Sequence, residues 1–172
     1  MNNNVQPSVS YRKGNIDDLE QIKDLTWLAY SQFENVISKD NLKQWEAGLK
    51  KNDTYITLLN KAFCIVCEDE NKIIGTAFLV PNGNPTELFQ TDWAYLRLVG
   101  VSPEYEGKGI GRKLTEMCID KARETGERTL ALHTSEFQHA ARHIYESLGF
   151  KKLKEFEIFG KKYWIYTLDL TK

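Results

Sequence analysis

The sequence of 172 residues contains few of the residues that mark secreted or nucleic-acid-binding proteins. It has three cysteines, four prolines and two methionines, and its formal net charge is −1. Three cysteines are sparse and odd in number, which excludes a disulfide framework. A net charge near zero gives no overall attraction to nucleic acid or to an anionic membrane. Composition therefore predicts no nucleic-acid partner and no membrane partner.

Long apolar stretches are also missing. No apolar run approaches the roughly 20 residues that span a bilayer, and the polar start M-N-N-N-V-Q-P is unlike a secretory signal. Hydrophobic residues make up 41% of the chain and charged residues 27%, which is typical of a globular protein with a substantial core. We expect a cytoplasmic protein with a flexible tail at 1–9 and a single domain at 10–172.

Two of the cysteines, Cys64 and Cys67, form a C-x-x-C in the stretch F-C-I-V-C-E. This stretch is typical of a strand, where residues three apart point to opposite faces. A redox pair would favour a helix N-terminus, and a zinc site would need a second Cys or His pair. Buried structural cysteines are therefore favoured over redox or metal chemistry, and we predict no metal site.

Hydrophobic periodicity predicts a mixture of strands and helices without repeats or linkers. A helix is expected from Asp17, a candidate N-cap, and a helical or irregular stretch at 38–50. Another helix should have an apolar stripe that begins at Ile110 and should end at Gly126, and a further one should span 138–148. The expected strands are 11–14, 62–67, 72–80, 93–101, 128–133, 150–158 and 162–170, with hairpin turns at D-E-N-K and F-G-K-K.

Three alternating glycines, Gly107, Gly109 and Gly111, separate the strand at 93–101 from the next helix. Glycines at this spacing suggest that a nucleotide, a coenzyme phosphate or another part of the protein approaches the backbone closely. Successive N–H groups in such a turn can point at one phosphate, and the helix dipole adds positive potential. Lys108 and Arg112 add positive charge at the same place.

Two familiar phosphate-binding loops do not fit this stretch. A Walker A loop needs Ser or Thr after the lysine, whereas Gly109 follows Lys108. A dinucleotide fingerprint needs glycine at position 112, which is Arg112, and it follows the first strand of its unit. Here the turn follows the fourth expected strand.

The segment L-R-L-V-G-V-S-P-E-Y-E-G-K-G-I-G-R-K-L, from Leu96 to Leu114, resembles the GNAT superfamily of acyl-CoA-dependent N-acyltransferases. The family signature Q/R-x-x-G-x-G/A follows a strand and a short loop, and only its first position departs here, with Glu106. A second family feature, A-x-x-x-Y-x-x-x-G-F, is matched in 141–150. Two motifs in the right elements are far more specific than one glycine motif, and the order of elements over about 10–170 is also similar.

The resemblance implies an α/β (α+β) fold with a mixed, mostly antiparallel sheet of six to seven strands and about four helices. It implies direct transfer of the acetyl group of acetyl-CoA to a primary amine of a small molecule or protein. The strand backbone from Val99 to Val101 would pair with the pantetheine arm, and the amide of Gln138, where the family often has Asn, could offer a hydrogen bond. The residues implied around the pyrophosphate are Glu106, Gly107, Lys108, Gly109, Ile110, Gly111 and Arg112.

The resemblance also suggests a proton donor, Tyr145, which would protonate the departing thiolate. The alternative is ordinary packing, because Tyr145 has helical core spacing with its apolar neighbours. His133 is a candidate base with a suitable intrinsic pKa, or else a hydrogen-bonded, half-buried histidine. Glu87 and Asp92 could activate water or bind a cationic substrate, or remain solvated loop residues.

The acceptor is left open among amino acids, polyamines, aminoglycosides and protein amines. The resemblance implies that the first helices and the loop at 81–92 shape its pocket. The aromatic residues Trp27, Tyr30, Phe33 and Trp45 either line it or belong to the core. A homodimer through the terminal strands is compatible with the sequence. The alternative function is a non-catalytic acyl-CoA sensor or interaction module, which Glu106 favours and Tyr145 opposes.

Overall fold

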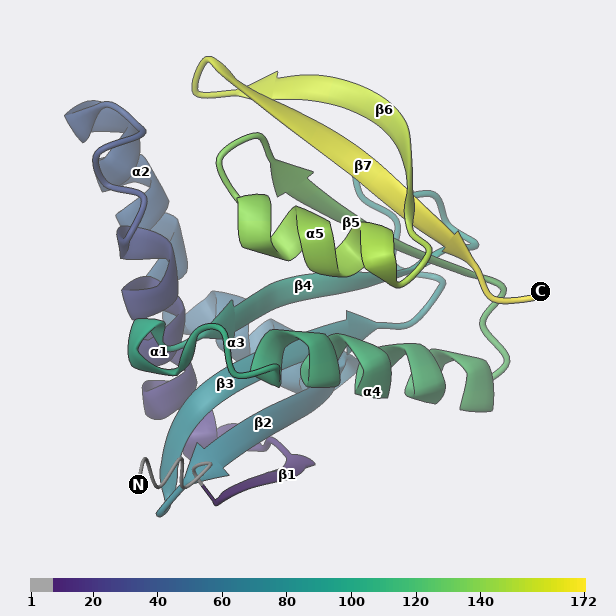
Figure 1. Ribbon diagram of the computed structural model, residues 1–172, viewed down its shortest axis with the longest axis horizontal. Coiled ribbons are helices and arrows are strands. Elements are labelled where there is room, and N and C mark those ends of the chain that lie inside the picture. Colours follow the sequence, from purple (N-terminus) through teal and green to yellow (C-terminus); the bar gives the residue numbers. More distant parts are fainter. Residues whose placement is uncertain (1–7) are drawn as a thin grey trace, which may run out of the picture.

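A computed structural model describes residues 8–172, and Figure 1 shows them arranged around one twisted sheet. The seven strands follow the order β1-β2-β3-β4-β5-β7-β6. Neighbouring strands are antiparallel except for β4 and β5, which are parallel. The strands are β1 (Val9–Lys13), β2 (Phe63–Asp69), β3 (Lys72–Val80), β4 (Ala94–Val101), β5 (Thr129–Ser135), β6 (Lys151–Ile158) and β7 (Lys161–Asp169). The expected mixed, mostly antiparallel sheet is confirmed.

Five α-helices and two short 3-10 helices accompany the sheet, where about four helices were expected. They are η1 (Ile16–Asp18), α1 (Leu19–Ser31), α2 (Lys39–Leu49), α3 (Asn52–Lys61), η2 (Pro103–Tyr105), α4 (Ile110–Glu124) and α5 (His139–Ser147). None of the helices between residues 8 and 172 is both long and apolar enough to cross a bilayer.

The two faces of the sheet carry separate hydrophobic cores. Helices α4 and α5 cover the face nearer the viewer in Figure 1 and bury Ile110, Leu114 and Tyr145 against it. Helices α1 and α3 cover the opposite face and bury Ile22 and Tyr55. Because strand side chains alternate between faces, Cys64 and Cys67 belong to different cores, as the sequence predicted.

In the first half of the chain, one prediction was wrong and one helix was missed. Helix α1 does not begin at Asp17, because Asn15 accepts a hydrogen bond from the Asp17 N–H and caps a short 3-10 turn first. Helix α3 was missed because its first half, N-D-T-Y-I-T, is rich in residues that favour strands. Burial of Tyr55 and Leu58 against the sheet outweighs that local preference.

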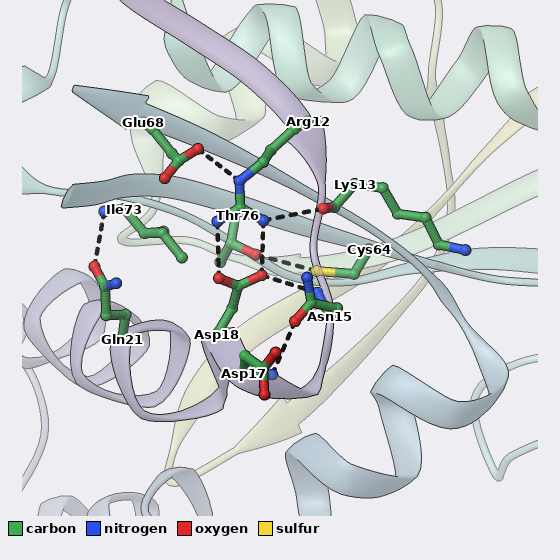
Figure 2. A network of polar contacts seen from close by, with 10 residues as sticks. All are labelled: Arg12, Lys13, Asn15, Asp17, Asp18, Gln21, Cys64, Glu68, Ile73 and Thr76. Atoms are coloured by element: carbon green, nitrogen blue, oxygen red, sulfur yellow. Dashed lines mark hydrogen bonds and ion pairs between the residues drawn. The ribbon is translucent and has the colours of Figure 1, made fainter. Parts of the chain in front are cut away.

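A polar network ties the first strand to the turn that follows it (Figure 2). The Arg12 guanidinium donates to both carboxylate oxygens of Asp18 at 2.8 Å and to Glu68 of β2 at 2.6 Å. Hydrogen bonds from Arg12 hold the pKa of Asp18 below its ordinary value. The strand already includes Val9, which was assigned to the tail, whereas tail residues 1–7 lie outside the described residues.

Candidate functional site

A β-bulge in the middle of β4 changes the direction of the strand. Arg97 pairs with Phe78 of β3 and Gly100 pairs with Thr76, so Leu98 and Val99 together oppose Ala77. Leu98 has a φ of +50°, an unusual value for a leucine. Such bulges bend a strand locally and redirect its side chains.

Beyond the bulge, β4 and β5 no longer pair. Their ladder contains only Ala94 with Leu130 and Tyr95 with Ala131. A cavity of about 510 Å³ opens where the strands part, and in Figure 1 helix α2 and the β6–β7 turn lie at this end of the sheet. Its lining comprises Tyr30, Gln44, Trp45, Gly48, Leu49, Thr54, Leu96, Arg97, Leu98, Val99, Leu132, His133, Thr134, Gln138, Ala141, Tyr145, Ile158, Phe159 and Tyr163.

Tyr145 is held in this cavity by the end of α5. Its ring packs against Phe150 with 5.8 Å between ring centroids, and Gly149, at a φ of +98°, turns the chain so that the Phe150 N–H bonds to the Tyr145 carbonyl. The Tyr145 hydroxyl makes no hydrogen bond to another described residue. Burial raises the pKa of Tyr145 above its ordinary value, so the phenol is protonated at neutral pH.

His133 enters the cavity from β5 among aromatic rings. The centroids of Phe89, Phe156 and Tyr163 lie 6.0–6.1 Å from the imidazole. Burial, and then the positive charge of Arg97, lower the pKa of His133 to about 4. The imidazole is therefore neutral at pH 7, and its buried Nδ1 has no hydrogen-bond partner among the described residues.

Gln138 lines the same cavity, but its carbonyl oxygen is already occupied. Oε1 accepts hydrogen bonds from the N–H and hydroxyl of Ser135 at 3.0 and 2.8 Å and from the Thr134 hydroxyl at 3.2 Å. Only the amide N–H groups of Gln138 are left to donate to a bound molecule.

The glycine turn lies before the N-terminus of α4. Gly107 and Gly109 have φ values of +74° and +81°, and a Cβ added at either would meet no atom within 4 Å. Gly111 differs, because it is helical and its added Cβ would make ordinary contacts. No described residue accepts a hydrogen bond from the N–H groups of 107–112, as the α4 ladder starts with the bond from Lys113 to Gly109.

This geometry removes one explanation for the glycines. Other parts of the protein do not pack against Gly107 and Gly109, so close approach within the fold does not require them. Their positive φ values instead shape an exposed turn with unused N–H groups at the start of a 15-residue helix. Such a turn fits the pyrophosphate of a coenzyme.

The charged side chains around this turn differ in their contacts. The Lys108 amine lies 5.2 Å from the Tyr105 ring centroid. Arg112 donates to Glu116 at 3.0 Å and to Ser147 at 2.7 Å, and Glu106 is exposed. The predicted residues thus form two groups: Val99, His133, Gln138 and Tyr145 line the cavity, whereas Val101 and the 106–112 turn lie outside its lining.

A larger cavity of about 690 Å³ lies between the loop at 85–93 and strands β6 and β7. It contains Glu87 but neither Tyr145 nor any residue of the glycine turn. Asp92 is exposed and lines neither cavity. The smaller cavity is therefore the better candidate site, because it contains a buried, protonated tyrosine and the part of β4 that does not pair with β5.

Of the four aromatic residues expected near the acceptor pocket, two line the smaller cavity and two do not. Tyr30 and Trp45 line the candidate site and contact each other edge to face, with ring centroids 5.1 Å apart. Phe33 packs against Phe137 beside it, and Trp27 packs under Lys50 instead.

Arg97 is a site residue that the sequence analysis missed. It is the one charged residue in the apolar stretch W-A-Y-L-R-L-V-G-V, and this contrast was the available signal. The structure places Arg97 in the cavity lining together with His133 and Tyr145. Among residues 8–172, no group of three or more His, Cys, Asp or Glu side chains could hold a metal ion.

Solved structures share this fold. The PaiA N-acetyltransferase of Thermoplasma acidophilum, in complex with coenzyme A, superimposes with a TM-score of 0.77 at 16% identity, covering 94% of this chain and 99% of that one. YncA of Salmonella typhimurium, a structure with acetyl-CoA, gives 0.65 at 21% identity over 94% of each chain.

Sequence relatives point to the same group of proteins. The chain is 32% identical to the "Probable N-acetyltransferase camello" of Xenopus tropicalis over 123 residues, 72% of this chain and 52% of that protein. It is 37% identical to the L-amino acid N-acyltransferase MnaT of Escherichia coli over 73 residues, 42% of each chain. The chain spans about half the length, or less, of these curated relatives.

The motifs that carry the initial resemblance lie in the bulged strand β4, in the glycine turn, and in helix α5 with the residues that follow it. Residues 19–150 match the model of the "Acetyltransferase (GNAT) family". The chain belongs to the GNAT acetyltransferase family.

Proposed function

We propose that this protein transfers the acetyl group of acetyl-CoA to a primary amine of a small molecule or a protein. The observation that carries the proposal is the separation of β4 from β5. This separation opens a cavity beside Tyr145, and the glycine turn follows β4 after the short helix η2. A coenzyme that lies along β4 can then place its phosphates at the turn and its thioester in the cavity.

The protein backbone would hold most of the coenzyme. The N–H groups of 107–112 and the positive end of α4 would bind the pyrophosphate. The edge of β4 from Val99 to Val101, which has no strand partner on the β5 side, would hydrogen-bond the extended pantetheine arm as another strand would. The free amide N–H groups of Gln138 would donate to an acceptor atom of the same arm.

Acetyl-CoA supplies an activated acetyl group as a thioester. The transfer forms a C–N bond between the acceptor amine and the carbonyl carbon and breaks the C–S bond. Tyr145 would protonate the departing sulfur, since its phenol carries its proton at neutral pH. The second product is coenzyme A with a free thiol.

The acceptor nitrogen must lose a proton during this transfer. His133 is neutral at pH 7 and lines the cavity, so a ring nitrogen that faces the cavity can accept a hydrogen bond from the amine or from a water molecule bound to it. A pKa of about 4 makes His133 a weak base, so we infer that it orients the amine or water and that solvent finally removes the proton.

Substitution of Tyr145 tests the proposal. We expect Tyr145→Phe to lower kcat by about 100-fold, the usual contribution of a positioned acid, while the KM for acetyl-CoA changes by less than about twofold. Thiol release measured with a panel of amines gives both parameters. Tyr11→Phe in β1, outside the cavity, is the matched control and should retain activity.

Two outcomes would contradict parts of the proposal. Full kcat in Tyr145→Phe would show that another group protonates the thiolate. Thermal stabilisation by coenzyme A without turnover of any amine would favour a coenzyme-binding module over an enzyme.

A further inference from the structure

Arg97 makes no ion pair, in contrast to Arg12 and Arg112, and it lies in the lining of the candidate site. Arg12 bonds to Asp18 and Glu68, as Figure 2 shows, and Arg112 bonds to Glu116. No carboxylate among residues 8–172 lies within ion-pair distance of Arg97, and residues 1–7 contain no Asp or Glu. A half-buried guanidinium without a counter-ion is costly, since folding removes part of its hydration.

The cavity around Arg97 offers no compensating negative charge. Its lining contains no Asp and no Glu, and Arg97 is its one residue with a permanent charge. A polyamine or another cationic acceptor would meet an unscreened positive group in this cavity. An anionic group on the acceptor would supply the missing partner.

The aromatic residues that the charge of Arg97 affects lie on one face of the sheet. Arg97 is two residues from Tyr95 and precedes the bulge, so both side chains point to the α1 and α3 face of the sheet. Its positive charge contributes to lowering the pKa of His133 and opposes the burial that raises the pKa values of Tyr30 and Tyr55. The guanidinium therefore lies on the sheet face that α1 and α3 cover, opposite the face that α4 covers.

We propose that Arg97 binds a carboxylate of the acceptor, so that the amine substrate is an amino acid or a similar amino carboxylate. This inference rests on the proposed function and specifies its acceptor class. A planar guanidinium matches a carboxylate in a two-pronged hydrogen bond, and a single positive charge balances a single negative one. The rings of Tyr30, Trp45 and Tyr163 favour an apolar side chain on that amino acid.

Matched acceptors test this inference by turnover. Each L-amino acid of an apolar panel is compared with its amide and with the amine that lacks the carboxylate. We expect kcat/KM for the best amino acid to exceed that of its amide by at least about 30-fold, the range of one charge-assisted hydrogen bond.

Substitution of Arg97 should remove this preference. Arg97→Gln should lower kcat/KM for the amino acid by about 100-fold, chiefly through KM, and change that of the amide by less than about threefold. Arg97→Lys keeps the positive charge but cannot form two parallel hydrogen bonds to a carboxylate, so it should retain a higher kcat/KM for the amino acid than Arg97→Gln. The KM for acetyl-CoA should not change, which distinguishes the acceptor carboxylate from a coenzyme phosphate as the ligand. Arg123→Gln, exposed at the end of α4, is the control.

Calorimetry separates the failure of this inference from the failure of the proposed function. N-acetylated amino acids of the panel are titrated into protein saturated with coenzyme A, which requires no turnover. Binding that is lost in Arg97→Gln supports the carboxylate site even if no amine is acetylated. Preference for acceptors without a carboxylate, an equal loss for amino acid and amide, or the absence of Arg97-dependent binding would overturn it while leaving acetyl transfer intact.

Discussion

The two halves of the proposed site differ in the groups that form them, backbone N–H groups in one and side chains in the other. The proposed coenzyme half (99–112) is one continuous segment that would act mainly through backbone N–H groups. The acceptor half (Tyr30, Trp45, Arg97, His133 and Tyr163) consists of side chains from α1, α2, β4, β5 and β7. A backbone site depends on turn geometry that a few glycines specify, whereas a side-chain site depends on how distant elements pack.

The strongest test of this contrast uses two glycines at opposite ends of α4. Gly109 and Gly126 both have a φ of +81°, and an added Cβ would meet nothing within 4 Å at either. Alanine should cost each variant similar stability, about 1 kcal/mol, because of the positive φ. Only Gly109→Ala should lose coenzyme A affinity, by about 100-fold, since its methyl group displaces a phosphate from one or two charge-assisted hydrogen bonds.

Titration calorimetry with coenzyme A and urea unfolding of the two variants measure these effects. Equal affinities in Gly109→Ala and Gly126→Ala would show that the glycine turn does not hold the phosphates. A loss of affinity in both would indicate an indirect effect through the stability of α4.

A smaller effect is expected from the acceptor half when pH changes. The pKa of His133 falls from an unfolded value of 6.5 to about 4 in the folded protein. Between these values the unfolded chain binds a proton and the folded protein does not, so stability decreases as pH falls from about 6.5 to 4. From pH 7 to pH 5 the wild type should lose roughly 2 kcal/mol more than His133→Gln.

Urea midpoints at the two pH values, with m-values compared, measure this difference. His143→Gln, at an exposed position on α5, is the control and should follow the wild type. Identical pH dependence in wild type and His133→Gln would mean that His133 is hydrated in solution. Its neutral form would then have no special role beside Arg97.

The same contrast explains what the sequence could reveal. The glycine turn, the two hairpin turns and the helical position of Tyr145 were predictable, because short motifs and periodicity specify each of them locally. The bulge at Leu98 was not, since no glycine or asparagine marks its positive φ. Arg97 was visible as a charge in an apolar strand, but its lack of a partner appears only when the elements around it are packed.

The smallest expected effect concerns Glu106, the one position where the glycine signature departs from its family pattern. Glu106 is exposed, so its carboxylate repels a bound pyrophosphate only through well-hydrated, salt-screened space. Glu106→Gln should therefore tighten coenzyme A binding by about two- to threefold at low ionic strength, and the gain should nearly vanish at about 0.5 M salt. Glu104→Gln, exposed in η2, is the matched control for loss of one negative charge nearby. A tenfold or larger gain in Glu106→Gln alone, which persists in high salt, would mean that the carboxylate points into the turn. The charge of the Glu106 side chain would then weaken coenzyme A binding substantially, in addition to what the backbone N–H groups contribute to it.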